Sequence, residues 1–552
     1  MARNHHTIGS YLLKRLQDYG VRHVFGIPGD YVLGFYEMLQ KSPIQVIGVT
    51  REDCAGYAAD AYARVHGIGA VCVTYCVGGL NVANSIAGAY AEKSPVVVLT
   101  GSPGIGERHN DPMLHHKIRS FSTQKEIFEK ITSAAVVLDD PVIAARQIDE
   151  TLATCRKTKR PVYIELPRDM VKVPLRHAMR TIVVRETSDR HALREALSET
   201  VRWINASRRP VILADVEVHR YGLVRELERF VRRTGIPVAA TLLGKSVISE
   251  RHPRYIGVYE GAMGRPEVQR FVEESDCLLM LGTFLTDMNL GIYTANLDRE
   301  QSIEATSEKV QVRHHHYSGI LFADFIRGLL GARIRKRNFP IPHPKPPNNA
   351  RSCSFPGNSA ITVTHLFERL NDFLQDNMVV VSDVGVCLFG AVDLVIHRGT
   401  EFLAPAYYTS MGFGVPAALG AQVARPKMRP VVLVGDGAFQ MTGTELSTIL
   451  RLKLNPIIIL LNNRGYTTER FILEGPFNDI TNWNYDSIPA LLGGGWGCNV
   501  RTTGEFDESW RKALSNRSSF SLLNIHLDKL DSSPGLQRLG ERLAAKLRKR
   551  KK

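Results

Sequence analysis

Short apolar runs that alternate with helical patterns are the feature that most restricts what this chain can fold into. AVCVTY (70–75) and PVVVLTG (95–101) are apolar at almost every position, which predicts strands buried on both faces of a parallel sheet. The segment before them, AGYAADAYARVHG (55–67), has the apolar spacing of a helix. Because strands and helices alternate in this way, we predict doubly wound α/β domains.

The alternation recurs along the whole 552 residues, a length that suits about three domains of ordinary size. Prolines and asparagines in NFPIPHPKPPNNARSCSFPGN (338–358) predict a linker. The predicted fold class is α/β, with three doubly wound parallel-sheet domains and a C-terminal helix. The predicted parts are an N-terminal domain at 1–182, a central domain at 190–338, a linker at 339–358, a C-terminal domain at 359–530 and a basic helix and tail at 531–552.

Composition predicts a cytoplasmic protein that does not bind membranes. Hydrophobic residues make up 44% and charged residues 23% of the chain, as in globular proteins. No apolar run approaches the ~18–20 residues that span a bilayer, and the polar N-terminus lacks the apolar core of a secretion signal. The eight cysteines form no CxxC motif, so we expect reduced thiols.

The net charge of +15 is concentrated at the C-terminus. Residues 538–552 contain eight Lys or Arg and one Glu, so this tail carries +7 and the rest of the chain +8. A basic tail can bind nucleic acid. Leu536, Leu539, Leu543 and Leu547 follow helical spacing, however, which favours a helix packed on the body of the protein. We therefore do not expect nucleic acid as a partner.

An aspartate between two glycines, Asp436 in VGDGAFQ (434–440), directly follows an apolar strand. A dinucleotide fingerprint, G-x-G-x-x-G, would need a third glycine where Gln440 stands. A phosphate loop at LLGKS (242–246) would need its first glycine where Ala239 stands, so GKS is predicted to be a plain turn between a strand and a helix. Neither phosphate-binding loop fits.

A metal site fits better. Asn463 and Gly465 follow the strand IIILL, 27 or more residues after Asp436, and one strand–helix–strand unit brings two such strand ends side by side. A carboxylate, an amide oxygen and a backbone carbonyl suit Mg²⁺, which usually completes its coordination with phosphate oxygens. A helix expected to begin near residues 441–444 would point its N-terminus at a bound anion. These residues predict a diphosphate held through a divalent ion.

GDG followed by NN after some twenty-five residues resembles the cofactor signature of thiamine-diphosphate enzymes, and the chain resembles their 2-oxo-acid decarboxylase branch over nearly its whole length. The motifs that carry the resemblance are GIPGDY (26–31), TREDCAGYAADAYAR (50–64), LHH (114–116), RPVYIELPRDM (160–170) and GYTTE (465–469). GAYAEKSPVVVLTGSPG, MGFGVPAALGAQ and GDGAFQMTG look particularly like phenylpyruvate and indolepyruvate decarboxylases.

The resemblance implies that the first domain binds the aminopyrimidine of thiamine diphosphate and the third binds its diphosphate through Mg²⁺, the central domain being structural. It implies a homodimer with active sites at the interface, assembled further into a homotetramer. The implied metal ligands are Asp436, Asn463 and Gly465. The implied cofactor-binding residues are Glu52, Gly385, Ser410, Met411, Gly435, Asp436, Gly437, Ala438, Asn463, Gly465 and Tyr466.

Two residues would activate the cofactor by resemblance. Glu52 stands after the apolar run IQVIGVT and would bond the aminopyrimidine, sharing its proton with a ring nitrogen. Taken alone, it equally fits a charge that opens the next helix. Met411, in TSMGFGVP, resembles the bulky residue that bends the cofactor and brings its amino nitrogen to the reacting carbon, a proximity effect.

Four further residues match the family's positions for protonating the enamine left after CO₂ departs. These implied catalytic residues are Asp30, His115, His116 and Glu469. Their work requires proton donors that operate near neutral pH. Adjacent histidines also occur in zinc sites, but the sequence shows no third ligand near His115 and His116, so we do not expect zinc there.

The substrate pocket is predicted to be roomy. Where pyruvate-specific relatives carry larger side chains, this chain has Leu388 and Thr468, while Ile472 is retained. Pocket volume decides which side chains are accepted. The implied function is therefore non-oxidative decarboxylation of a bulky 2-oxo acid, such as phenylpyruvate, indolepyruvate or a branched or long aliphatic one, to the aldehyde and CO₂ through an enamine on the cofactor.

Two alternatives remain. Acetohydroxy-acid synthases and other carboligases share the fold, but they lack the paired histidines and the glutamate of GYTTE. A non-catalytic binding protein with a nucleic-acid-binding basic tail would be expected to have lost Glu52, Asp436 or Asn463, and all three are present.

Overall fold

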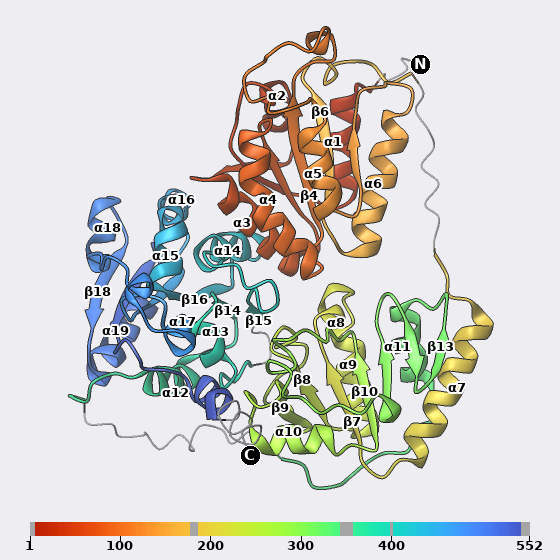
Figure 1. Cartoon of the computed structure of the whole chain (residues 1–552), viewed down its shortest axis with the longest axis vertical. Coiled ribbons are helices and arrows are strands. Elements are labelled where there is room, and N and C mark those ends of the chain that lie inside the picture. Colours follow the sequence, from red (N-terminus) through yellow and green to blue (C-terminus); the bar gives the residue numbers. More distant parts are fainter. Residues whose placement is uncertain (1–5, 177–185, 343–356, 398–400, 542–552) are drawn as a thin grey trace. The chain divides into compact units, whose positions relative to one another are not determined.

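Three β-sheets with helices packed on them make up the computed structural model of the chain (Figure 1). It describes residues 6–176, 186–342, 357–397 and 401–541. These residues form two compact units. The first comprises described residues of Met1–Val184, Val415–Lys427 and Thr442–Leu454; the second comprises those of Arg185–Gly414, Met428–Met441 and Asn455–Lys552. The domain boundaries expected from the sequence stay a prediction.

The first sheet has six parallel strands in the order β2-β1-β3-β4-β6-β5. Its strands are β1 (His23–Gly26), β2 (Gln45–Gly48), β3 (Gly69–Val73), β4 (Val96–Ser102), β5 (Ala135–Val137) and β6 (Val162–Pro167). Its helices are α1 (Ile8–Asp18), α2 (Leu33–Gln40), α3 (Glu52–His66), α4 (Val77–Ala91), α5 (Thr123–Ile131) and α6 (Ala144–Thr158). Strands β3, β4 and β6 are buried at every position, as their continuous apolar sequences predict.

The second sheet has seven strands in the order β13-β12-β11-β10-β7-β8-β9. Its strands are β7 (Pro210–Ala214), β8 (Val238–Ala240), β9 (Tyr255–Val258), β10 (Cys277–Leu281), β11 (Ser302–Ala305), β12 (Val310–Val312) and β13 (His315–Tyr317). Its helices are α7 (Arg190–Ala206), α8 (Glu217–Arg220), α9 (Val224–Thr234), α10 (Pro266–Glu273) and α11 (Phe322–Gly331).

Two details of this sheet differ from the sequence prediction. Strands β12 and β13 are antiparallel, because the connections on either side of β12 are too short for a crossover helix. The turn that contains GKS leads from β8 to β9, and the residues between these strands, all of them described, form no helix. Lys245 of that turn is buried, and its Nζ lies 2.8 Å from Glu250 Oε1, so this lysine forms an internal ion pair.

The third sheet has six parallel strands in the order β15-β14-β16-β17-β19-β18. Its strands are β14 (Met378–Ser382), β15 (Glu401–Leu403), β16 (Arg429–Gly435), β17 (Ile457–Asn462), β18 (Trp496–Val500) and β19 (Ser521–His526). The helices between them are α12 (Val363–Phe373), α13 (Val386–Ala391), α14 (Gly414–Ala424), α15 (Asp436–Thr442), α16 (Leu446–Arg451), α17 (Thr467–Ile472), α18 (Ile488–Leu491) and α19 (Thr503–Ser515).

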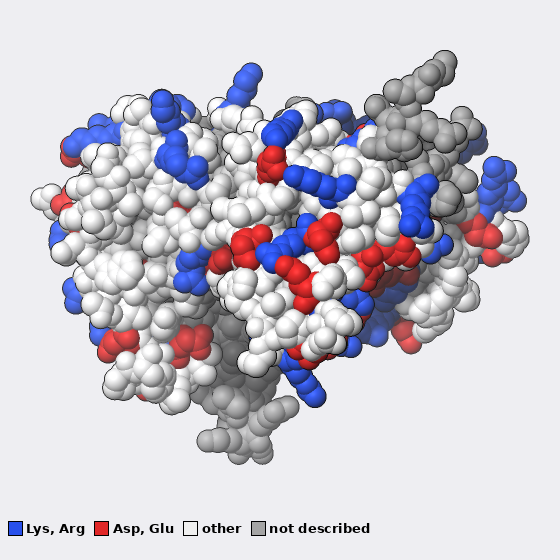
Figure 2. All heavy atoms as spheres, turned by 90° about the horizontal axis from the view of Figure 1, so that it is seen from above, with Lys and Arg blue, Asp and Glu red and all other residues white. Residues whose placement is uncertain are grey.

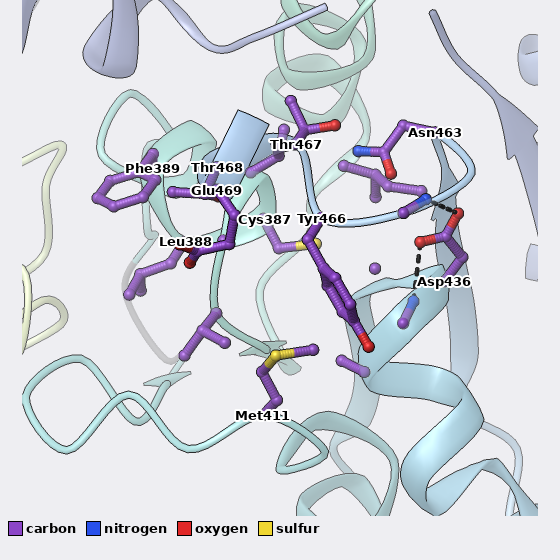
Figure 3. A pocket seen from close by; sticks show the side chains of 18 of the residues that line it. Cys387, Leu388, Phe389, Met411, Asp436, Asn463, Tyr466, Thr467, Thr468 and Glu469 are labelled. Atoms are coloured by element: carbon purple, nitrogen blue, oxygen red, sulfur yellow. Dashed lines mark hydrogen bonds between the residues drawn. The ribbon is translucent and has the colours of Figure 1, made fainter. Parts of the chain in front are cut away.

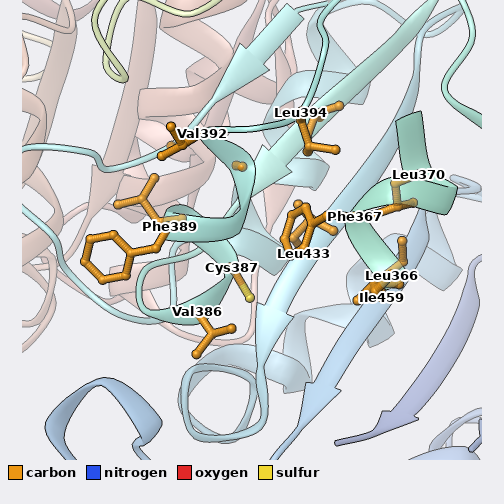
Figure 4. Packing of buried hydrophobic residues seen from close by; sticks show 14 of the residues in the cluster. Leu366, Phe367, Leu370, Val386, Cys387, Phe389, Val392, Leu394, Leu433 and Ile459 are labelled. Carbon is orange, nitrogen blue, oxygen red and sulfur yellow. The ribbon is translucent and has the colours of Figure 1, made fainter. Parts of the chain in front are cut away.

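One buried cluster joins the third sheet to its helices. It includes Leu366 and Phe367 of α12, Leu433 of β16 and Ile459 of β17 (Figure 4). Residues of α13 belong to the same cluster, so this short helix is fixed by the core on one side. That packing holds the polypeptide at the carboxyl ends of β14 and β16 in one position.

Helices α14 and α16 follow strands of the third sheet in sequence but belong mostly to the first unit. Glu445, just before α16, accepts hydrogen bonds from Thr50 through both the backbone N–H (3.1 Å) and the hydroxyl (2.7 Å). Gly420 of α14 lies so close to the Ala58 carbonyl of α3 that a Cβ there would clash. Contacts between segments this far apart in sequence were not predicted.

The C-terminal helix is confirmed as far as residue 541, since residues 534–541 are helical and Leu536 and Leu539 are buried. Leu543 and Leu547 lie outside the described residues, as does Cys353. The other seven cysteines form no disulfide with one another. In the described part of the chain, no helix is long and apolar enough to cross a membrane. Acidic and basic side chains are intermingled on the face shown in Figure 2.

Candidate cofactor and metal site

A cavity of about 480 Å³ opens in the second unit where β14, β16 and β17 end (Figure 3). Carboxyl ends of parallel strands are the usual place for ligands in such sheets. Twelve residues that the sequence analysis selected line this cavity: Gly385, Leu388, Met411, Gly435, Asp436, Gly437, Ala438, Asn463, Gly465, Tyr466, Thr468 and Glu469. Ser410 is not among the lining residues, although its neighbour Thr409 is.

Asp436 lies at the polar end of the cavity and is 1% exposed. Its Oδ1 accepts a hydrogen bond from the Gly437 N–H (2.8 Å), and its Oδ2 accepts from the Arg464 (2.6 Å) and Gly465 (3.2 Å) N–H groups. Burial raises the pKa of Asp436 to about 6, although these hydrogen bonds favour the carboxylate. A cation bound to this carboxylate would offset the cost of burying its charge and would lower the pKa again.

The helix that follows Asp436 starts earlier than the sequence suggested. Helix α15 begins at Asp436 itself, not near residues 441–444, because GDGAFQ already takes helical geometry directly after the strand. Gly437 and Ala438 thus belong to its first turn and line the cavity. The first turn exposes backbone N–H groups that have no partner within a helix.

Asn463 is the second predicted metal ligand and is 4% exposed. Its Oδ1 accepts no hydrogen bond from any described residue. Figure 3 shows Asn463 and Asp436 at the same end of the cavity. A buried amide oxygen without a donor is unfavourable unless it meets a ligand, and a hard cation is the ligand that this oxygen and the carboxylate share. The donor chemistry therefore fits Mg²⁺.

Glycines give the polar end its shape. Gly465 has a φ of +141° and approaches the Asn478 carbonyl so closely that a side chain would clash. A Cβ on Gly435 would meet no atom within 4 Å, so it would project into open space. Gly435 thus leaves open space beside Asp436, whereas Gly465 lets two backbone segments approach each other closely.

Asp383 supports the loop before α14 and was missed by the sequence analysis. It is fully buried and accepts hydrogen bonds from the N–H groups of Val384 (2.9 Å), Gly412 (3.3 Å) and Gly414 (2.8 Å). Burial raises its pKa to about 6. These bonds hold the segment that carries Met411, whose side chain reaches into the cavity (Figure 3). The available signal was an aspartate directly after the buried strand β14.

The opposite end of the cavity is largely apolar. Leu388 and Phe389 of α13 lie there with Thr468 and Glu469 of α17 (Figure 3). Leu388 is 1% exposed, so the core fixes its position. Cys387, Phe389, Thr409, Met441 and Met288 also line the cavity, and no motif singled them out.

The structure does not place Ile472 with Leu388 and Thr468 in the cavity. Ile472, the last residue of α17, is 77% exposed and is not among the residues that line the cavity. Its predicted place in the substrate pocket therefore has no support within one chain.

Glu52 lies in the first unit as the first residue of α3. Strand β2 ends at Gly48, so Glu52 opens a helix and does not end a strand. Asn81 of α4 donates a 2.6 Å hydrogen bond to Glu52 Oε2, which fixes the orientation of the carboxylate.

Asp30, His115 and His116 come together in the first unit. Asp30 Oδ2 lies 2.9 Å from His115 Nε2, and one ligand atom from each of the three residues lies within 4.8 Å of the other two. The sequence analysis found no third ligand near the histidine pair, and that was wrong: the loop after β1 brings Asp30 to them across 85 residues of sequence.

Models of known protein families match the chain over most of its length. Three thiamine pyrophosphate enzyme models match in order: the N-terminal TPP binding domain over residues 6–127, the central domain over 197–325 and the C-terminal TPP binding domain over 383–525.

Three named proteins are similar to most of the chain. An indole-3-pyruvate decarboxylase of Azospirillum brasilense is 36% identical over 521 residues, covering 93% of this chain and 94% of the relative. An alpha-keto-acid decarboxylase of Mycolicibacterium paratuberculosis is 33% identical, covering 95% and 94%. A putative pyruvate decarboxylase of Schizosaccharomyces pombe is 32% identical, covering 88% of each chain.

Proposed function

Because the chain belongs to the thiamine-diphosphate-dependent 2-oxo-acid decarboxylase family, we propose that it decarboxylates a bulky 2-oxo acid to the corresponding aldehyde. The candidate substrates are phenylpyruvate, indolepyruvate and branched or long aliphatic 2-oxo acids. The observation that carries the proposal is the cavity itself, which has oxygen donors at one end and apolar side chains at the other. Such an arrangement suits a charged cofactor group beside an apolar substrate side chain.

Thiamine diphosphate supplies the electron sink that makes loss of the carboxyl group possible. Asp436, Asn463 and the Gly465 carbonyl would hold Mg²⁺, the usual partner metal of the family, and through it the diphosphate. Gly435 leaves the backbone open there, since a Cβ on it would meet no atom within 4 Å, and Gly437 and Ala438 also line the cavity. Met411 would set the position of the cofactor rings from the other side of the cavity.

Glu52 is the proposed partner of the aminopyrimidine. Its carboxylate is oriented by Asn81 and belongs to the first unit, whereas the metal donors belong to the second. We propose that the chain forms homodimers, and further homotetramers, in which the first domain of one chain completes the site of another. Phe471, Leu473 and Phe477 come shortly after the cavity residue Glu469 in sequence, and their apolar side chains are exposed. These side chains support an interface with another chain at this segment.

Proton delivery to the product is assigned to Asp30, His115, His116 and Glu469. Glu469 lines the cavity. His115 and Asp30 are within hydrogen-bonding distance of one another and are exposed, so both are accessible to a substrate. A group that donates a proton near neutral pH is effective when it is held within hydrogen-bonding distance of its acceptor.

Substrate choice is assigned to Leu388 and Thr468. Both line the apolar end of the cavity, and neither is large. The 36% identity to an indole-3-pyruvate decarboxylase favours an aromatic substrate. Because pocket volume discriminates by steric fit, the larger acids should outcompete pyruvate.

Aldehyde release, coupled to an alcohol dehydrogenase, tests the proposal. The purified protein is given thiamine diphosphate, Mg²⁺ and, in turn, pyruvate, 2-oxoisovalerate, a long straight-chain acid, phenylpyruvate and indolepyruvate. We expect aldehyde from the larger acids, and its loss in Glu52→Gln and in Asp436→Asn. CO₂ without aldehyde would instead assign the protein to the carboligases, and no turnover of any acid would refute the decarboxylase.

A further inference from the structure

The cluster of Asp30, His115 and His116 offers the ligands of a transition-metal site. One ligand atom from each residue lies within 4.8 Å of the other two, and all three belong to the first unit. We propose that these residues bind a zinc ion, with ligands other than the Asp436 and Asn463 donors assigned to Mg²⁺. Zinc binding itself does not depend on the proposed function; its effect on catalysis does.

One ligand distance is close to the one that zinc requires, and the other two are at most 4.8 Å. With bonds of about 2.0–2.1 Å in a tetrahedral site, two ligand atoms lie about 3.3 Å apart. Asp30 Oδ2 and His115 Nε2 are 2.9 Å apart, so a few tenths of an ångström would admit the ion between them. The side chains of His115 and Asp30 are 58% and 42% exposed, so they have space to make that adjustment.

Tyr31 fixes the ring of His115 in the orientation that a metal needs. The Tyr31 ring is stacked on the His115 imidazole, with centroids 4.7 Å apart and planes 21° apart. The Tyr31 hydroxyl lies 3.3 Å from His115 Nδ1. Metal-binding histidines characteristically engage their second ring nitrogen with a neighbouring group, which orients the ring. Nε2 of His115 is thereby directed at Asp30.

The charges around the cluster do not repel a cation strongly. Arg168 Nη1 lies 3.7 Å from Asp30 Oδ2, but the same guanidinium pairs with Glu107. That bond keeps the pKa of Glu107 below its usual value, so Glu107 stays ionised and offsets the arginine. Lys117, next in sequence to His116, is directed to Asp111 at 2.6 Å.

The ligand types select zinc over magnesium. Two imidazole nitrogens and one carboxylate suit Zn²⁺, whereas Mg²⁺ prefers oxygen donors. Three protein ligands also leave a fourth position open on the ion. Because zinc would occupy the nitrogen lone pairs and the carboxylate assigned to proton delivery, the ion is expected to inhibit the decarboxylase while leaving Mg²⁺ and cofactor bound.

Metal titration tests the site without substrate. The holoprotein, with thiamine diphosphate and excess Mg²⁺, is titrated with Zn²⁺ by calorimetry and with Co²⁺ by visible absorption. We expect one ion per chain, tetrahedral Co²⁺ bands, and at least a tenfold weaker affinity in Asp30→Asn and in His115→Gln. His315→Gln, which changes an exposed histidine of β13 that contacts Glu199, serves as the matched control and should bind as the native chain does.

The outcomes separate the two proposals. Zinc affinity that is equal in the native chain and in both ligand variants would overturn the zinc site. The absence of zinc binding to the native chain would overturn it as well. Melting temperature and cofactor binding report whether each variant is folded. If zinc binds at the site but no 2-oxo acid is decarboxylated, the zinc site stands and the proposed function fails; if decarboxylation proceeds unchanged with zinc bound, the inhibitory role is refuted.

Discussion

At the scale of single residues, the polar end of the cavity follows from chemistry that the sequence already displays. Asp436 and Asn463 each come directly after a buried strand, and both lie at the same end of the cavity because those strands are neighbours in the sheet. The buried Oδ1 of Asn463, without a donor among the described residues, is the atom most in need of a ligand. At the apolar end, the size of each side chain sets the volume that is left for the substrate.

Leu388→Trp should narrow the cavity and shift substrate choice toward small acids. Since one methylene in an apolar pocket is worth about 1–3 kcal/mol, a much larger side chain should lower kcat/KM for phenylpyruvate relative to pyruvate at least tenfold. The ratio of the two kcat/KM values is the measurement, with cofactor affinity as a check on folding. An unchanged ratio would show that Leu388 does not face the substrate.

Ile472→Ala is the matched comparison. Because Ile472 lies outside the cavity of its own chain, its removal should leave that ratio unchanged. A shift as large as that of Leu388→Trp would restore the sequence prediction and place Ile472 in the pocket by way of another chain.

At the scale of elements, three neighbouring strands support the metal donors through a chain of amides. Asn462 Nδ2, at the end of β17, donates to Asn524 Oδ1 of β19 at 3.0 Å, and Asn524 Nδ2 donates to Asn499 Oδ1 of β18 at 2.7 Å. Asn462 and Asn524 are buried within an otherwise apolar sheet. Asn462 precedes the predicted ligand Asn463, so the amide chain fixes the backbone from which that ligand extends.

Asn524→Leu should therefore weaken metal binding without touching the cavity. The change leaves the buried Nδ2 of Asn462 without its acceptor, at about 1–3 kcal/mol, whereas Asn499 Oδ1 keeps its contact with His526 Nε2 at 2.8 Å. We expect a lower free energy of unfolding and a tenfold or greater loss of Mg²⁺-dependent cofactor affinity, measured by fluorescence titration. His526→Gln, at the partly exposed outer end of this series of hydrogen bonds, should have a much smaller effect. Equal cofactor affinity in Asn524→Leu and the native chain would contradict the role of the amides in metal binding.

At the scale of the whole molecule, burial of charge makes stability depend on pH. Asp215 follows β7 and is fully buried, and burial raises its pKa to about 7. Its carboxyl accepts hydrogen bonds from the Val216 (2.6 Å) and Phe284 (2.7 Å) N–H groups, which reduce the shift without cancelling it. The folded chain therefore keeps a proton that the unfolded chain releases near pH 4.

The stability of the second unit should fall as pH rises between about 4 and 7. In that interval Asp215 binds more protons in the folded state than in the unfolded state. The stabilisation from its protonation is therefore complete below the pKa that Asp215 has in the unfolded chain, and it is lost once the pH passes the pKa that Asp215 has in the folded chain. Three pKa units correspond to about 4 kcal/mol at most. Asp215→Asn should flatten the slope of the free energy of unfolding against pH over this interval. If the measured slope is the same in the variant and the native chain, the pH dependence arises from other groups.

Much of the fold was predictable because local patterns repeat. Continuous apolar runs such as those of β3, β4 and β17 identify strands buried on both faces. The short strands β12 and β13 escaped prediction, since three residues carry too little periodicity to distinguish a strand from a loop. Likewise, Asp383 belongs to no motif. Only the three backbone N–H groups that donate to its carboxylate show that it supports the loop before α14.

The sequence by itself determined that Asp436 and Asn463 lie at one edge of the sheet, because each follows a buried strand and parallel topology requires neighbouring strand ends to converge. Only the tertiary structure decided the rest. Asp30 joins His115, 85 residues away in sequence, and its neighbour His116, and Ile472 is exposed and does not line the cavity to which the sequence had assigned it. Loop positions depend on the packing beneath them, and no pattern along the chain records which distant segment that packing brings near.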